Sequence, residues 1–330
     1  MKKFVVHAGP HKTGTTYIQS LLHNNRDALH SQGVVYPEAY YLFLGHHYLL
    51  NALNGSESCD EVRRKILDAT AGAETCIISS ENFISLHRSG LIKLKDAFPE
   101  VEFRFVLYSR RPSIRLLSRW HELVKQGSFQ SLESYFISHL MRPMQSRDVN
   151  IVHYLKDLAS IFGGSCHHLV DYDTAAYDKN IMSCFFKAAG IDPVVKDQDS
   201  VVNKMERLEE VEIIRALNYK AKKMGILKAS NIREAYYRAK SEDAGLVSRV
   251  ESLVDLMKGF SNVLALGDAG FDAGVRRLLD LNYSNRFVNR ISTPERKEYI
   301  VPSADWTMDA EALQGLGDIS KVVFEKTYEK

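Results

Sequence analysis

One N-terminal segment decides the fold of this chain: Phe4-Val5-Val6-His7-Ala8-Gly9-Pro10-His11-Lys12-Thr13-Gly14-Thr15-Thr16. Its apolar start predicts a short buried strand, and a helical pattern of apolar residues follows at once at Tyr17, Ile18, Leu21 and Leu22. A strand, a glycine-containing turn and a helix N-terminus bind phosphate well, because backbone N–H groups and the positive end of the helix dipole face the anion. Lys12 adds a positive charge to that turn. The segment therefore predicts a phosphate-binding loop at the start of an α/β fold.

The position of the lysine separates this loop from the loop of nucleoside-triphosphate enzymes. In a Walker A motif, G-x-x-x-x-G-K-[ST], the lysine follows the second glycine. Here Lys12 precedes Gly14 by two residues, and Thr15 and Thr16 follow the glycine directly. This order, after an N-terminal strand, resembles the 5′-phosphosulfate loop of sulfotransferases that use 3′-phosphoadenosine 5′-phosphosulfate (PAPS). The alternative is a turn that only joins a strand to a helix, and one lysine and three threonines around a glycine argue against it.

A second anion-binding motif lies further along the chain. The apolar run 103–108 predicts a buried strand, and it leads through Ser109-Arg110-Arg111-Pro112 into an amphipathic helix that proline is suited to start. Residues 110–120 resemble the sulfotransferase 3′-phosphate motif, R-[DN]-P-x-x-R-x-x-S-x-[YW]. The resemblance implies that Arg110 and Ser118 hold the 3′-phosphate and that Arg115 is the helix arginine of the motif. The alternative is a basic surface helix with solvated arginines.

This second motif departs from the family pattern at one position. Arg111 stands where the family often has an acid or an amide. A guanidinium fork suits a phosphate, so either Arg110 or Arg111 can make the bidentate contact.

The resemblance also assigns roles within the first loop. It implies that Lys12 meets the charge on the sulfuryl group and the bridging oxygen, and that Thr13, Gly14, Thr15 and Thr16 bind the 5′-phosphate. His11 either donates to the sulfuryl group or only fills the turn. By analogy with phosphoryl transfer, most of the rate gain comes from positioning and electrostatics. PAPS is then the co-substrate, its 3′-phosphoadenosine 5′-phosphate (PAP) part is the product, and no metal is expected.

The general base has several candidates. His46 and His47 follow the first helix and second strand, a region that supplies the base in many sulfotransferases, and histidine titrates near neutral pH. Glu81 comes directly after the apolar strand 75–79, and a carboxylate can serve as the base if its site raises its basicity. Glu38 is a third option. Each also has a structural reading, as a helix cap, a packed ring or an exposed side chain.

Composition limits the functional classes. The 330 residues carry 43 basic and 41 acidic side chains, a net charge of +2, which does not suggest nucleic-acid binding. Four widely spaced cysteines form no C-x-x-C pair, so neither a zinc site nor a redox pair is expected. No apolar run approaches the roughly 20 residues that span a bilayer, and the N-terminus does not read as a signal peptide, so a cytoplasmic enzyme is expected.

Alternating strands and helices predict a P-loop-like three-layer α/β fold with a parallel sheet. Strands are expected at 3–8, 34–36, 75–79, 102–108 and 166–170, and helices at 15–30, 60–71, 89–97, 113–126, 131–140, 149–162 and 178–189. Residues 1–200 then form a PAPS-binding core. Residues 201–330 form a mainly helical extension of the same domain that covers the acceptor side. In it, long helices are expected at 205–224 and 232–257, a strand at 262–267, and a largely irregular last thirty residues with one short helix.

Together these features predict a PAPS-dependent sulfotransferase with a hydroxyl or amine acceptor, as on a bacterial glycan or glycolipid. Two rival interpretations stay open: a kinase-like phosphotransferase with an unusual phosphate loop, and a PAP- or glycan-binding protein without catalysis. Weaker candidates for contact with the nucleotide or acceptor are the dipeptides Asn203-Lys204 and Asn285-Arg286, together with Arg142 and Arg147.

Overall fold

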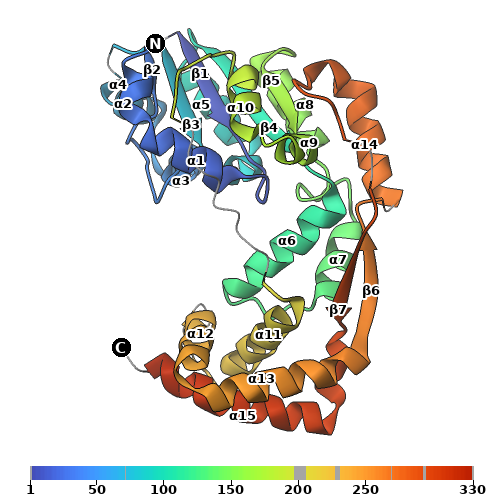
Figure 1. Ribbon diagram of the computed structural model, residues 1–330. Helices are drawn as coiled ribbons and strands as arrows, with labels where there is room; N and C mark the ends of the chain where they lie inside the picture. The colour runs from blue at the N-terminus through green and yellow to red at the C-terminus, as the bar shows by residue number, and fades with distance from the viewer. Residues whose placement is uncertain are drawn as a thin grey trace. The chain divides into compact units, whose positions relative to one another are not determined.

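The computed structural model describes residues 2–70, 72–196, 206–226, 231–268, 270–292 and 295–328. The chain forms two compact units, coloured along the chain in Figure 1. The first comprises Met1–Arg115, Pro143–Val202 and Gly270–Pro294, and the second comprises Leu116–Arg142, Asn203–Ala269 and Glu295–Lys330. Residues 116–142, which were expected in the first part, thus cluster with the second unit, and 270–294 clusters with the first. Asn203 and Lys204 lie outside the described residues.

The first unit is built on a five-stranded parallel sheet, as the strand pattern predicted. Its strand order is β2-β3-β1-β4-β5. The strands are β1 (Lys3–His7), β2 (Val34–Val35), β3 (Thr75–Ser79), β4 (Glu102–Ser109) and β5 (His167–Asp171). Each lies within two residues of its expected range. The α/β fold class is confirmed (Figure 1).

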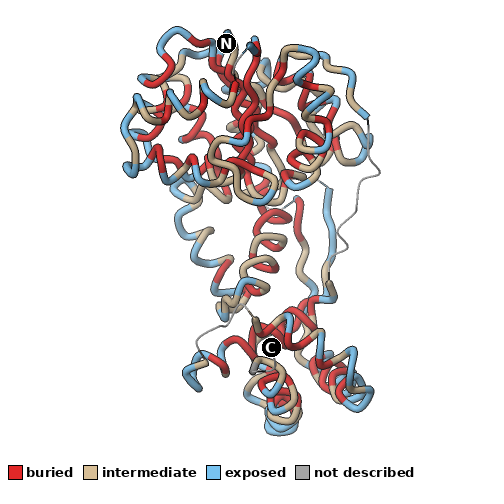
Figure 2. The backbone as a smooth tube through the Cα atoms, turned by 90° about the vertical axis from the view of Figure 1, so that its left-hand side faces the viewer, coloured by how far each residue is buried: buried red, intermediate tan, exposed pale blue. Residues whose placement is uncertain are grey.

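Apolar side chains on both faces explain why these strands are continuous hydrophobic runs. On one face, Val5, Ile77 and Val106 pack with Ile18, Leu21 and Phe185 from helices. On the other face, Phe4, Phe103 and Phe105 of the sheet stack on one another and make tilted ring contacts with Phe98 and Phe162. Figure 2 shows the resulting concentration of buried backbone along the strands. The sheet is therefore a rigid platform for the loops that leave its carboxyl edge.

The helices of the first unit follow the predicted pattern with a few divisions. The described ones are α1 (Thr15–Asn24), α2 (Arg26–His30), α3 (His47–Asn51), α4 (Cys59–Asp68), α5 (Arg88–Ala97), α8 (Val152–Phe162), α9 (Tyr172–Tyr177), α10 (Ile181–Ala189) and α14 (Gly270–Tyr283), with short helices η1 (Ala52–Ser56), η2 (Glu81–Ser85) and η5 (Ser284–Arg286). Helix α6 (Pro112–Lys125) begins in this unit and continues into the second. The helix expected at 15–30 is two helices, because Asn25 leaves the helical conformation and its amide donates to the Leu21 carbonyl.

The second unit is mainly helical. Besides most of α6, it contains α7 (Leu132–Leu140), α11 (Leu208–Lys223), α12 (Ile232–Glu242), α13 (Ala244–Met257), α15 (Ala310–Tyr328), η4 (Lys258–Phe260), η6 (Ala304–Met308) and an antiparallel ribbon of β6 (Ser261–Leu266) and β7 (Lys297–Pro302). The strand near 262–267 is confirmed. The helical stretch 232–257 breaks at Asp243, whose carboxylate caps α13 by accepting from the Leu246 N–H.

The expectation of a largely irregular C-terminus was wrong. β7 and the 19-residue helix α15 occupy it instead. Ala312, Leu316, Ile319 and Val323 of α15 are all buried, and their spacing of three and four residues is the period of an amphipathic helix. No helix among the described residues is both long and apolar enough to cross a membrane.

Sheet topology places two of the loops of interest side by side. β1 and β4 are hydrogen-bonded neighbours, with His7 opposite Val106 near their carboxyl ends. From β1 the strand order runs to β3 and β2 on one side and to β4 and β5 on the other, so the order reverses between β1 and β4. In open α/β sheets ligands bind beyond the carboxyl ends of strands at such a switch point.

Candidate functional site

The loop between β1 and α1 is shaped for an anion. Gly9, Lys12 and Gly14 all have positive φ angles, of 68°, 65° and 76°. Turns of this kind gather backbone N–H groups into anion-binding concavities. Gly14 is the N-cap of α1 and has no side chain to satisfy the first-turn N–H groups of that helix, which then suit a bound anion. The Thr13 hydroxyl is buried and donates to the Pro10 carbonyl at 2.6 Å, so it holds the turn together.

Two glycines of this loop are required by close packing. A Cβ on Gly9 would lie 2.8 Å from the Cα of Glu81, closer than real Cβ atoms approach. A Cβ on Gly14 would lie 3.3 Å from Cε2 of Tyr172. The loop is therefore pressed against the residues that follow β3 and β5.

Arg110, which lies between the end of β4 at Ser109 and the start of α6 at Pro112, reaches this loop. Its Nη1 donates to the Lys12 carbonyl at 2.7 Å, and its guanidinium lies 5.1 Å from the Tyr172 ring centroid. The residue at the end of β4 and the loop after β1 thus belong to one cationic site. The two segments that the sequence assigned to separate phosphates meet at Arg110.

Arg111 has a different environment from Arg110. Its backbone N–H and its Nε both donate to Oδ2 of Asp173, each at 3.1 Å. Arg110 Nε lies 3.9 Å from the other carboxylate oxygen of Asp173. Asp173 therefore faces both arginines, and Arg110 also donates to the Lys12 carbonyl of the first loop. This contact is the reason to propose Arg110 rather than Arg111 as the phosphate ligand.

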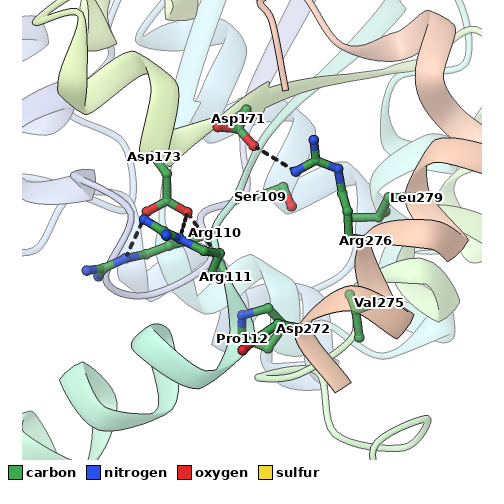
Figure 3. A pocket seen from close by; sticks show the side chains of 10 residues that line it. All are labelled: Ser109, Arg110, Arg111, Pro112, Asp171, Asp173, Asp272, Val275, Arg276 and Leu279. Carbon is green, nitrogen blue, oxygen red and sulfur yellow. Dashed lines mark hydrogen bonds and ion pairs between the residues drawn. The ribbon is translucent and has the colours of Figure 1, made fainter. Parts of the chain in front are cut away.

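A small pocket lies beside these arginines (Figure 3). Ser109, Asp171 and Asp173 line it from the ends of β4 and β5, and Asp272 and Arg276 line it from α14. Arg276 Nη1 lies 3.7 Å from Asp171, and Asp272 accepts a hydrogen bond of 2.8 Å from the Ser113 N–H at the start of α6. Helix α14, which the sequence interpretation did not predict, thus fixes the first turn of α6.

Glu81 lies where the loop packs against the end of β3. Its Oε2 accepts from the Gln19 amide of α1 at 3.0 Å, and its Oε1 lies 3.9 Å from Nδ1 of His11. Burial raises the pKa of Glu81, but its own backbone N–H, the rings of His47 and His11 and the Gln19 amide together outweigh burial and lower it. Glu81 is therefore an ionised, oriented carboxylate at the phosphate loop. Its site lowers its basicity, whereas the sequence interpretation expected a carboxylate base to have its basicity raised. His11, for which the sequence left two roles open, is beside it.

His47 lies close enough to this carboxylate to help lower its pKa. It begins α3, and its Nδ1 is 2.8 Å from the Ser80 hydroxyl and 3.5 Å from the Asn82 amide. Ser80, Glu81 and Asn82 follow β3 directly. His47 and Glu81, two of the predicted base candidates, are thus brought together by the segment 80–82.

His46 has a structural position, which argues against its prediction as a base. Its Nδ1 accepts the Ser79 N–H at 3.1 Å and its Nε2 lies 2.9 Å from the Pro37 carbonyl, so both ring nitrogens are engaged. The ring is fully buried between Tyr36 and Tyr41. Burial lowers the pKa of His46 to about 3. It has no nitrogen left to take a proton from a substrate.

The other predicted residues lie further from this cluster or in the second unit. Glu38 is 84% exposed and pairs with Arg26 on the surface. Arg115 is buried and donates to the Arg147 carbonyl, and Arg147 in turn donates to the carbonyls of Ile84 and Leu86, which makes both of them supports for the chain after Glu81.

Ser118 and Arg142 belong to the second unit. Arg286 lies near His167 and His168 at the amino end of β5, away from the predicted nucleotide loops. Its charge adds to burial in lowering the pKa of both histidines.

Sequence reasoning missed four residues of this cluster: Gln19, Tyr172, Asp173 and Arg276. Gln19 carried a weak signal, because it lies one helical turn after Thr15 and so on the side of α1 near the loop. Tyr172 and Asp173 follow the predicted strand 166–170 directly, and the carboxyl end of a strand next to β4 was a place to look. Arg276 had no local signal, since its helix returns to the sheet from far along the chain.

Comparison with known proteins adds little to this geometry. No family model matches the chain, and no curated protein resembles it in sequence. Among solved structures, a sulfotransferase from Alicyclobacillus acidocaldarius is similar over 67% of this chain and 95% of its own, with 16% sequence identity and a TM-score of 0.42. A similarity of this size carries no conclusion about activity.

Proposed function

We propose that the protein is a sulfotransferase that moves the sulfuryl group of PAPS to a hydroxyl or amine acceptor, with a glycan or glycolipid as the acceptor class. The observation that carries this proposal is the hydrogen bond from Arg110 to the Lys12 carbonyl. It joins an anion loop after β1 to a strand-end arginine after β4, and PAPS has two separate phosphates to occupy such a pair of sites.

The chemistry of the donor set fits this ligand. Lys12, the backbone of Gly14 and the first turn of α1 are suited to the 5′-phosphosulfate, and the hydroxyls of Thr15 and Thr16 add donors. Arg110 is suited to the 3′-phosphate, since a guanidinium fork binds phosphate in two places. Ser118 is proposed as a further 3′-phosphate ligand on the family resemblance alone.

In the proposed reaction the acceptor oxygen attacks sulfur and forms a new S–O bond. The bond between sulfur and the bridging phosphate oxygen breaks, and PAP leaves with that electron pair. Lys12 offsets the charge that develops on the bridging oxygen. The acceptor proton goes to Glu81, which we assign as the general base because it is ionised, held by Gln19 and packed against the loop at Gly9. His47 and His11 flank this carboxylate and stabilise its charge.

Transfer of labelled sulfate from PAPS to a panel of glycans and glycolipids tests the proposal. Lys12→Ala should lower the transfer rate at least about 100-fold, the scale on which removal of one oxyanion-stabilising donor acts. Lys2→Ala is the matched control, because the Lys2 side chain is 83% exposed and pairs with Glu74. Equal rates for Lys12→Ala and wild type would contradict the role of Lys12.

A further inference from the structure

Asp173 occupies an unusual place for an acid, between two arginines in the cationic site. It lies in the first turn of α9, two residues after the end of β5. Asp171, at that strand end, is the partner of Ser109 at the end of β4. The pairing of β4 with β5 thus brings Asp173 directly opposite Arg110 and Arg111 (Figure 3).

The contacts of Asp173 are directional and shielded. Oδ2 accepts two hydrogen bonds from Arg111, one from its backbone and one from its side chain, and Oδ1 faces Nε of Arg110 at 3.9 Å. The three side chains are only 11% to 18% exposed. Solvent screens charge pairs only weakly at such sites, so the Asp173 carboxylate attracts both guanidinium groups more strongly than it would at the surface.

The two arginines need such a partner. They are adjacent in sequence and carry like charges, which repel each other in a half-buried site. The contacts with Asp173 offset one of these charges and fix Nε of Arg111. Arg110 then keeps its other edge on the Lys12 carbonyl and its face against Tyr172.

We infer that Asp173 is a positioning residue that orients Arg110 for the 3′-phosphate and so sets the preference for nucleotides that carry this group. The inference rests on the proposed PAPS-dependent function. It predicts that the carboxylate of Asp173, beside Arg110, strengthens binding of the 3′-phosphate. Direct repulsion between the carboxylate and the phosphate would weaken that binding, so the direction of the change in affinity separates the two effects.

The test measures binding of PAP and of ADP, which lacks the 3′-phosphate, by calorimetry in full-length variants. Asp173→Ala should weaken PAP binding at least about tenfold and change ADP binding less than about twofold. Asp173→Asn keeps an acceptor oxygen for the Arg111 N–H groups and should fall between Asp173→Ala and wild type. Asp178→Ala, which removes an exposed acid at the C-terminal end of the same helix, is the matched control and should leave both affinities unchanged.

The PAP and ADP affinities of the variants decide whether Asp173 orients Arg110 or only repels phosphate. Tighter PAP binding in Asp173→Asn than in wild type would mean that the carboxylate merely repels phosphate, and it would overturn the inference. An unchanged preference for PAP over ADP in Asp173→Ala would also overturn it. Wild-type protein that shows no preference for PAP would instead refute the proposed function itself. A general loss of structure would lower PAP and ADP binding together, and Asp173→Asn, which is isosteric, guards against that outcome.

Discussion

Replacement of Arg110 tests how the two predicted phosphate sites are joined. Arg110 donates to the Lys12 carbonyl at 2.7 Å and lies 3.9 Å from Asp173. A hydrogen bond to a charged group is worth about 1.5–3 kcal/mol. Since 1.4 kcal/mol corresponds to a factor of ten in affinity, loss of one such bond to the 3′-phosphate should raise the PAP dissociation constant by roughly 10- to 150-fold in Arg110→Ala.

Two further substitutions sharpen this prediction. Arg110→Lys keeps the charge but loses the guanidinium fork, so we expect an intermediate loss. Arg111→Ala should cost less PAP affinity than Arg110→Ala, because Arg111 donates to Asp173 through both its backbone N–H and its Nε, whereas Arg110 donates to the Lys12 carbonyl of the first loop. Arg88→Ala, at a 54% exposed arginine that pairs with Asp157, is the matched control.

The assay is calorimetric titration with PAP at fixed ionic strength, with unfolding curves to show that each variant is folded. A PAP dissociation constant within twofold of wild type in folded Arg110→Ala would refute the reasoning. A larger effect of Arg111→Ala than of Arg110→Ala would refute the choice between the two arginines.

Three other predictions follow from the same site. Glu81→Gln should lower the sulfate transfer rate about 100-fold or more. Because the pKa of Glu81 lies below its usual 4.5, wild-type kcat/KM should stay level from neutral pH down toward pH 5. A fall in kcat/KM near the ordinary histidine pKa of about 6.5 would indicate a histidine base instead. His46 has a folded-state pKa of about 3, below its unfolded value of 6.5, so its stabilising effect is complete above pH 6.5 and is lost as pH falls toward 3. His46→Gln should therefore reduce the fall in the free energy of unfolding over that pH range. The same change at exposed His30 should leave that fall as it is in wild type. Gly9→Ala should lower the free energy of unfolding in urea by about 2–5 kcal/mol, from left-handed strain and from the clash with Glu81. Gly33, with a φ of 73°, has open space around it, so Gly33→Ala should cost only the strain of about 1–2 kcal/mol. Equal losses for the two glycines would contradict the close packing at Gly9.

Local patterns were sufficient for most of the sheet. The strands at 75–79 and 102–108 are runs of apolar residues, and burial on both faces leaves such runs little alternative in a parallel sheet. The helix α15 was expected only as a short helix, although its buried positions repeat with helical spacing, because Gly315 and Gly317 weaken helix propensity in its centre. Tertiary packing overrides that preference.

The site was partly predictable for the same reason. Lys12, Gly14 and Arg110 follow strands directly, so the chain order alone places them at the carboxyl edge of the sheet. The contacts of Asp173 and Gln19 depend on which strands and helices become neighbours, and a single sequence does not state that order. His46 and His47 looked equivalent in sequence, yet His46 packs into the core and His47 contacts Ser80, next to Glu81. The difference arises because α3 starts between them.

Titration of the wild-type protein with PAP, ADP and Mg·ATP tests the central claim most directly. Two joined anion sites suited to a 3′-phosphate and a 5′-phosphate predict that PAP binds at least about tenfold more tightly than either ADP or Mg·ATP. Equal or tighter binding of Mg·ATP would contradict the proposed use of PAPS and would favour a phosphotransferase.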